Sequence, residues 1–256
     1  MIDVHCHILP GIDDGAKSFD DSLYMLRKAE EAGITDIVLT PHYIPGSKYN
    51  ANNVTKWKLF LDLREKVKLA GLSMNLYLGN EIYIDQELPE MLSAYGNPQV
   101  ASANPHTASG KIYEISTLNS GRYVLIELPV GAEDKSVYST LFSLVQKGFI
   151  PVIAHPERYI YVQDNPNYFD DFMRMGCVLQ GDYLALTGKY GKRAEKTLKK
   201  MLSEGKIFCL ASDVHKTTDE YALDLTEKKL IRILKDPKKV EELLVDNPRK
   251  IIRSMV

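Results

Sequence analysis

The chain has 256 residues, of which 45% are hydrophobic, so it is long enough to bury a sizeable core and to form one α/β barrel domain. Its 32 Lys and Arg residues nearly balance 34 Asp and Glu residues, and the net charge of −2 gives no electrostatic reason to expect binding to nucleic acid or to a membrane surface. The chain has no basic segment followed by an apolar run at its start, no apolar stretch long enough to insert into a membrane and no CxxC pair among its three cysteines, so we expect a cytoplasmic protein with reduced thiols.

The first predicted element is a short strand over residues 2–7, which carries His5 and His7. Strand side chains alternate between two faces, so both imidazoles point to the same face and can hold one metal ion between them. Two polar histidines near a flexible N-terminus are the alternative, and this pair alone does not exclude it. Cys6 points to the opposite face, so we expect it to pack behind the site.

Six further strands are predicted along the chain. Five of them follow a glycine at which a helical pattern stops, and the sixth covers residues 123–128. The glycines are Gly33, Gly71, Gly148, Gly176 and Gly205. Helices are expected after an N-cap at Ser18, over 56–70, 136–147, 165–175 and 192–204, and over 226–254 with Asn247 as a cap before Pro248. This alternation predicts a parallel sheet, closed or open, with its site at the carboxyl ends of the strands.

Residues 96–122 interrupt the alternation because they are rich in Gly, Asn, Ser, Thr and Pro. The βα pattern continues on both sides, so we interpret the segment as a long loop or insertion within a single domain over residues 1–256. Loops of this length often act as lids or contact surfaces. His106 lies in this segment, and we expect it to be an exposed loop histidine.

Side chains that bind metals stand at or near the carboxyl ends of the predicted strands. Asp14 follows the first strand directly, and the others are His42, Glu81, Glu127, His155, Asp213 and His215. Polar residues often end strands because loops begin there, which explains one or two of these positions. It does not explain Glu127 inside an apolar run, because a buried unpaired carboxylate is costly. Histidine and carboxylate ligands without thiolate therefore predict a site for several Mn, Fe or Zn ions.

The ordered motifs HCH, DDG, TPH, GNE, AHPER and SDVH, with a glutamate in the strand before AHPER, resemble the PHP (polymerase and histidinol phosphatase) superfamily. The segments MIDVHCHILPGIDDG, NEIY, LNSGRYVLIEL, PVIAHPERY and DNPRKII resemble its bacterial tyrosine-protein phosphatase branch, which acts with capsule and exopolysaccharide operons. The similarity runs from residue 1 to about residue 253. It implies a distorted (β/α)7 TIM-like barrel, the PHP fold, with three divalent metal ions, for which Mn²⁺ is expected and Fe or Zn is an alternative.

The same resemblance implies three sets of ligands. His5, His7, Glu127 and Asp213 share in one ion, Glu81 and His155 bind a second, and Asp14, His42 and His215 bind the third. Which carboxylate oxygens bridge two ions stays open, and Asp13 is able to exchange roles with Asp14.

Phosphoester hydrolysis suits such a site, because clustered divalent ions lower the pKa of a bound water and neutralise charge on phosphate oxygens. Arg158 follows His155 by three residues, so we interpret it as the catalytic phosphate contact at the same strand ends, with a surface arginine as the alternative. Phosphotyrosine has a good leaving group, so a metal-bridging hydroxide and Arg158 suffice without a strong general acid. The cysteine route needs an arginine six positions after a cysteine, and none of the three cysteines has one.

The family often has an arginine after the final D-x-H motif, where this chain has Lys216. Lysine offers a point charge without bidentate geometry, so the second phosphate contact is in question. We predict a metal-dependent protein-tyrosine phosphatase that acts on the tyrosine-rich tail of a bacterial autokinase. The alternatives are a PHP phosphatase of a small phosphomonoester such as histidinol phosphate, a non-catalytic PHP binding module and an amidohydrolase. The sequence leaves a homo-oligomer possible.

Overall fold

The computed structural model describes residues 1–50, 53–93, 115–131, 133–134 and 136–254. Most of the predicted 96–122 insertion, including His106, lies outside these residues. Its described end, residues 115–122, contains a short helical turn at Leu118–Ser120.

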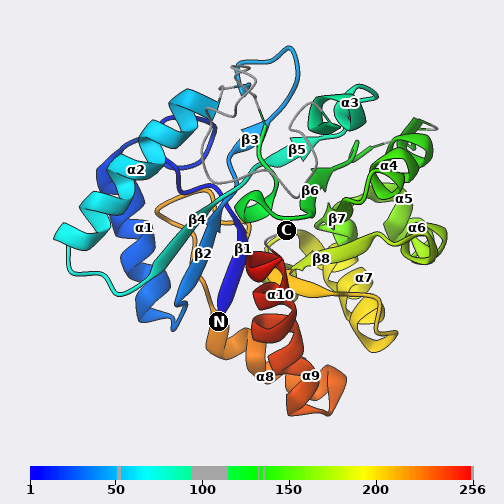
Figure 1. Ribbon diagram of the computed structural model, residues 1–256. Coiled ribbons are helices and arrows are strands. Elements are labelled where there is room, and N and C mark those ends of the chain that lie inside the picture. Colours follow the sequence, from blue (N-terminus) through cyan, green and yellow to red (C-terminus); the bar gives the residue numbers. More distant parts are fainter. Residues whose placement is uncertain (51–52, 94–114, 132, 135, 255–256) are drawn as a thin grey trace.

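Two parallel sheets form the centre of the molecule (Figure 1). The first has the order β1 (Ile2–Cys6), β2 (Asp36–Leu39) and β4 (Asn75–Leu78). The second has the order β3 (His42–Tyr43), β5 (Glu81–Tyr83), β6 (Tyr123–Glu127), β7 (Ile150–Ala154), β8 (Val178–Asp182) and β9 (Cys209–Ala211). Since β2 leads into β3 and β4 leads into β5 after two-residue breaks, the nine segments occupy the seven predicted strand positions within the described residues.

The outer strands β1 and β9 meet at their carboxyl ends. The backbone N–H of Asp213 donates to the carbonyl of His5 and that of His7 donates to the carbonyl of Val214, each at 2.9 Å. Cys6 and Val214 also form an isolated parallel bridge. The parallel α/β fold is confirmed, whereas closure of the barrel along its full length stays a prediction.

Helices surround the strands (Figure 1). They are α1 (Phe19–Glu31), α2 (Asn53–Leu69), α3 (Leu88–Ser93), α4 (Ser136–Gln146), α5 (Ile160–Asp164), α6 (Asp170–Met175), α7 (Gly191–Ser203), α8 (Leu223–Leu234), α9 (Pro237–Glu241) and α10 (Asn247–Arg253). Short turns cover Pro156–Arg158, Tyr183–Thr187 and Glu242–Asp246. The helix predicted over 165–175 is shorter than expected, because α6 begins only at Asp170, and α5 was not predicted.

Two layers of apolar side chains make up the core. One lies among the strands themselves and includes Val4, Val38, Leu125 and Val152, with Ile251 of α10 packed against them. The other, larger layer lies between the strands and the surrounding helices. The strands are therefore buried on both faces, as their nearly continuous apolar sequences indicate.

The two predicted helix caps have different outcomes. The side chain of Ser18 accepts a hydrogen bond from the backbone N–H of Asp21, so this cap of α1 is confirmed. The prediction for Asn247 is wrong, because the chain is already helical before it and Asp236 caps the start of α9 instead. The Asn247 amide donates to the carbonyl of Phe208 at 2.8 Å, so it ties α10 to the strand region.

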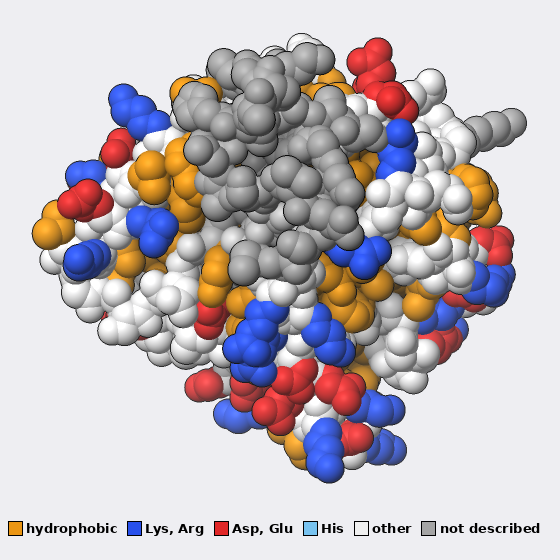
Figure 2. All heavy atoms as spheres, viewed as in Figure 1, with side chains coloured by type: hydrophobic (Ala, Val, Ile, Leu, Met, Phe, Trp, Pro, Cys, Tyr) orange, Lys and Arg blue, Asp and Glu red, His pale blue; other side chains and the backbone are white. Residues whose placement is uncertain are grey.

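Among the described residues, no helix combines the length and the apolar character needed to cross a membrane. On the face shown in Figure 2, basic and acidic side chains lie interspersed at the end formed by α8 and α9. This mixture of signs agrees with the near balance of charges in the sequence.

Candidate metal centre

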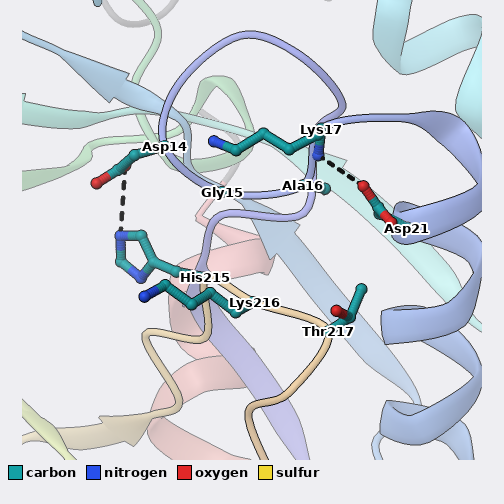
Figure 3. Close-up of a pocket in the computed structure, with 8 residues that line it drawn as sticks. All are labelled: Asp14, Gly15, Ala16, Lys17, Asp21, His215, Lys216 and Thr217. Carbon is teal, nitrogen blue, oxygen red and sulfur yellow. Dashed lines mark hydrogen bonds and ion pairs between the residues drawn. The ribbon is translucent and has the colours of Figure 1, made fainter.

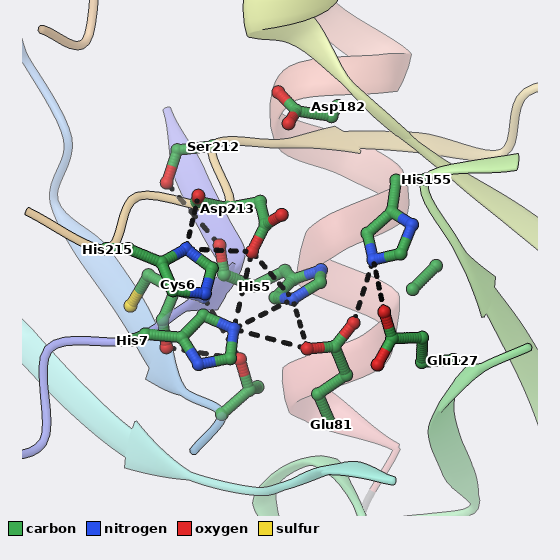
Figure 4. A network of polar contacts seen from close by, with 12 residues as sticks. His5, Cys6, His7, Glu81, Glu127, His155, Asp182, Ser212, Asp213 and His215 are labelled. Atoms are coloured by element: carbon green, nitrogen blue, oxygen red, sulfur yellow. Dashed lines mark hydrogen bonds and ion pairs between the residues drawn. The ribbon is translucent and has the colours of Figure 1, made fainter. Parts of the chain in front are cut away.

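Strands from distant parts of the chain bring four buried ligand atoms together at their carboxyl ends (Figure 4). The Nε2 atoms of His5 and His7 lie 3.3 Å apart. Glu81 Oε2 lies 3.3 Å from the first and 3.2 Å from the second, and Asp213 Oδ1 lies 3.2 and 3.3 Å from them. All four side chains are at most 2% exposed. We call this end of the strands, with the candidate ligands on it, the metal rim.

An irregularity in β1 places both imidazoles at the rim. The register of β1 against β2 shifts between Asp3 and Cys6, and the Asp3 carboxylate accepts a hydrogen bond from the N–H of His5 at 3.4 Å. Val4 packs in the inner apolar layer, whereas Cys6 packs in the outer one. In a regular strand these two side chains would share a face, so the shift turns His5 and His7 toward the interior. Cys6 packs behind the site, as predicted.

The spacing of the four atoms suits shared coordination of a metal ion better than hydrogen bonds among the four side chains. Two ligands bound to the same ion at about 2.1 Å are separated by about 3.0–3.4 Å, which is the spacing seen here. Glu81 Oε2 and Asp213 Oδ1 are buried and make no hydrogen bond within the described structure. A buried carboxylate oxygen without a donor is costly, so its partner is expected to be a cation.

Hydrogen bonds to the opposite ring nitrogens orient three of the imidazoles. Nδ1 of His5 contacts Gln180 Oε1 at 2.8 Å, Nδ1 of His7 contacts Asp13 Oδ2 at 2.8 Å, and Nδ1 of His215 contacts the Asp213 carbonyl at 3.0 Å. Each contact leaves Nε2 free for a metal ion, which is the usual arrangement around ligating histidines.

Asp13 and Asp14 have different environments, although the sequence left their roles interchangeable. Asp13 accepts hydrogen bonds from the backbone of Gly15 and of His42, in addition to its contact with His7. The carboxylate of Asp14 lies 3.6 Å from His42 Nε2 and 3.7 Å from His215 Nε2. Asp14 is therefore the better candidate ligand, and Asp13 positions His7.

Two further groups of candidate ligands adjoin the first four. One comprises His7, Asp14, His42 and His215, and the other comprises His42, Glu81 and Glu127. His155 Nε2 lies 2.9 Å from Glu81 Oε1 and 3.9 Å from Glu127 Oε1. All nine residues predicted as ligands thus lie at one rim. The resemblance implied that Glu127 shares an ion with His5 and His7, but the distances place Glu81 beside these two histidines.

Burial and neighbouring charges set the protonation of the rim. Burial acts to lower the pKa of His5. The negative charges of Glu81 and Asp213 outweigh this effect and raise the pKa well above its ordinary value. Burial raises the pKa of Glu127 to about 7, with further help from Glu81. Burial and the nearby Arg158 guanidinium lower the pKa of His155 to about 4, so this imidazole is neutral and free to coordinate at pH 7.

Arg158 lies at the rim, as its spacing from His155 predicted. Its guanidinium donates to Asp213 Oδ2 and lies 4.7 Å from the centre of the Tyr190 ring, and the side chain is 27% exposed. Lys216 is exposed and lines a pocket of about 210 Å³ together with Lys17, Asp14 and other residues (Figure 3). The pocket lies beside the His215 end of the rim.

Sequence reasoning missed the buried carboxylates of Asp182 and Glu157. Asp182 ends β8, so this strand also has an acidic residue at its carboxyl end (Figure 4). Glu157 Oε1 accepts a hydrogen bond from the N–H of Asp182 at 3.0 Å. Burial and the neighbouring Asp182 charge raise the pKa of Glu157 to about 8. The Gly-Asp pair after an apolar run was the available signal for Asp182.

The sequence as a whole matches a known family model. Residues 1–253 match the family described as capsular polysaccharide synthesis, CpsB/CapC. This chain belongs to the CpsB/CapC family. The predicted branch of bacterial tyrosine-protein phosphatases is thereby confirmed.

Individual relatives match from 86% to all of the chain. The tyrosine-protein phosphatase CpsB of Streptococcus pneumoniae is 31% identical over 98% of this chain and 98% of its own length. The putative tyrosine-protein phosphatase CapC of Staphylococcus aureus is 31% identical over 86% of this chain and 78% of its own. Among solved structures, the metal-dependent tyrosine phosphatases YwqE from Bacillus subtilis and CpsB from S. pneumoniae give a match with a TM-score of 0.86 at 26% identity, which covers 100% of this chain and 96% of the matched chain.

Proposed function

We propose that this CpsB/CapC family member is a metal-dependent protein-tyrosine phosphatase. The observation that carries the proposal is the cluster of buried imidazoles and carboxylates, with two carboxylate oxygens that lack donors, directly beside Arg158. Such a cluster suits cations, and an adjacent arginine suits the phosphate that those cations attract. The names of the relatives point to the same chemistry.

Three divalent ions, with Mn²⁺ as the expected metal and Fe or Zn as alternatives, are part of the proposal. Three overlapping groups of ligand atoms support this number, because His7, His42 and Glu81 each belong to two of them. When bound, the ions supply an activated water near neutral pH and neutralise charge on the phosphate oxygens. The mixed nitrogen and oxygen donors, without thiolate, fit these metals.

The side chains of the chain itself bind and orient the substrate. Arg158 holds the phosphate, and its ion pair with Asp213 and its position over the Tyr190 ring orient the guanidinium. Lys216 adds positive charge from the neighbouring pocket. Phenolate is a good leaving group, since the tyrosine pKa of about 10 is far below that of an alkyl alcohol, so a strong acid is not required.

The proposed substrate is the phosphorylated, tyrosine-rich tail of a bacterial autokinase that controls capsule or exopolysaccharide synthesis. The family description of capsular polysaccharide synthesis supports this choice. The three cysteines are unpaired and buried, which supports a cytoplasmic location. A homo-oligomer is compatible with the proposal.

Hydrolysis by the purified, Mn²⁺-loaded protein tests the proposal. We expect a higher kcat/KM for a phosphotyrosine peptide than for histidinol phosphate at equal metal content. A preference for histidinol phosphate would favour the small-substrate alternative. Hydrolysis that persists after complete removal of metal would refute the metal-dependent mechanism.

A further inference from the structure

Lys56 is a fully buried lysine with a polar network of its own. Lys56 lies on α2 and is 1% exposed. Its Nζ donates to Asn80 Oδ1 and to Ser116 Oγ, the latter at 3.2 Å. Burial lowers its pKa well below the ordinary value, and no carboxylate of the described residues offsets this effect. An enclosed amine without a carboxylate is costly, so its presence calls for an explanation.

Asn80, one of the two partners of Lys56, connects the break between β4 and β5 to the break between β2 and β3. Asn80 occupies the break between β4 and β5, and its Nδ2 donates at 2.8 Å to the carbonyl of Pro41, in the break between β2 and β3. The N–H of Glu81 donates to the same carbonyl at 3.2 Å. Asn80 Oδ1 also accepts from the N–H of Ser116 at 2.9 Å, so the Asn80 amide is held from several sides.

Each break is followed at once by a candidate ligand. Pro41 precedes His42 and Asn80 precedes Glu81, and the two ligands are paired in register between β3 and β5. His42 Nδ1 lies 3.0 Å from Glu81 Oε2. The Asn80 side chain therefore acts together with the backbone hydrogen bond from Glu81 to Pro41 in setting how far apart the two breaks lie, and with it the distance between the two ligands.

We propose that Lys56 and Asn80 are positioning residues that hold His42 and Glu81 at the spacing needed for tight metal binding. Lys56 touches neither ligand, and it acts through the Asn80 amide. Partners of this kind behind metal ligands typically change metal affinity by about 10- to 100-fold. The inference rests on the metal centre proposed above, and it assigns part of the metal affinity to a helix outside the rim.

Calorimetric titration of the metal-free protein with Mn²⁺ tests the inference. We expect Lys56→Met and Asn80→Ala each to weaken Mn²⁺ binding by about 10-fold or more. The double variant should bind no more weakly than the worse single variant, because both substitutions interrupt one connection. Asn80→Ala retains the lysine and its contact with Ser116, so it keeps the test decisive if Lys56→Met does not fold.

Two control variants on α2 separate positioning from general stability. Lys58→Met removes an exposed lysine and should leave Mn²⁺ affinity unchanged. Leu63→Ala removes a fully buried leucine, so it should lower the stability of the metal-free protein without weakening Mn²⁺ binding.

Wild-type affinity in both Lys56→Met and Asn80→Ala would overturn the inference, as would an equal loss of affinity in Leu63→Ala. Failure of the wild-type protein to bind any of Mn²⁺, Fe²⁺ and Zn²⁺ would instead refute the proposed metal centre. The two failures are thus distinguishable in one series of titrations.

Discussion

Replacement of Arg158 tests the link between the metal rim and phosphate binding. The side chain is 27% exposed and its guanidinium is oriented by Asp213 and Tyr190, so it offers a prearranged phosphate contact. Loss of one such charged contact lowers kcat/KM by about 100- to 1000-fold, or about 2.7–4 kcal/mol of transition-state stabilisation. We expect Arg158→Ala to lie in this range. Arg158→Lys should lower kcat/KM less, because lysine keeps the positive charge. It should still lower it, because lysine lacks the bidentate geometry.

The assay is hydrolysis of a phosphotyrosine peptide at saturating Mn²⁺, with the metal content of each variant measured in parallel. The metal measurement matters because Arg158 pairs with Asp213, a candidate ligand. Arg174→Ala is a matched control, since Arg174 also pairs with an aspartate but is 71% exposed on α6. A kcat/KM for metal-replete Arg158→Ala within threefold of the wild type would refute the assignment of Arg158 to the phosphate.

Three other predictions concern the rim and its buried acids. Chelation with EDTA should abolish hydrolysis and added Mn²⁺ should restore it, and activity that survives chelation would contradict the metal rim. His42→Ala should lose activity and bind fewer ions by elemental analysis, because His42 belongs to two ligand groups; unchanged hydrolysis would show that the groups are misassigned. Glu157 has a pKa of about 8 in the fold and 4.5 as a free group. Its contribution to stability is therefore complete below pH 4.5 and is lost as the pH rises from there through 8. The total loss is up to about 5 kcal/mol. Glu157→Gln should therefore flatten the decline in melting temperature of the metal-free protein between pH 5 and 9, and an unchanged decline would show that Glu157 is not its cause.

The order of the strands and the position of the site could be predicted from local signals. Apolar runs after helix-ending glycines mark the strands, and parallel strands place their carboxyl ends at one edge. The nine candidate ligands could therefore be predicted to lie together before any contact was known. The assignment of Glu81 and Glu127 to particular groups of ligands could not be predicted, because it depends on the distances between strands that are far apart in the chain.

Features that depend on tertiary contacts were missed or only partly predicted. The alternation of β1 gave the shared face of His5 and His7, but the register shift that turns this face inward has no signature in the residues. Lys56 was predicted only as part of a helix, because a lysine in a helix is ordinarily exposed. Asn247 carries a strong cap signal, yet the helical residues before it continue through a π turn and override that local preference.

Backbone strain at the rim leads to a prediction about His155. Its φ of 34° is left-handed, as is the φ of 48° at Asp213, and both are candidate ligands that follow strands. A side chain in this conformation costs about 1–2 kcal/mol, and such strain persists where function requires it. His155→Gly and His155→Ala both remove the imidazole, but only glycine relieves the strain.

We therefore expect the metal-free glycine variant to be more stable than the alanine variant by about 0.5–1 kcal/mol, after allowance for the greater flexibility of unfolded glycine. Urea unfolding of both variants in EDTA provides the measurement. Both should lose metal and activity, because neither has a donor to replace Nε2 near Glu81. An alanine variant as stable as the glycine variant would show that the strain at His155 is negligible, so that the position is set by metal binding alone.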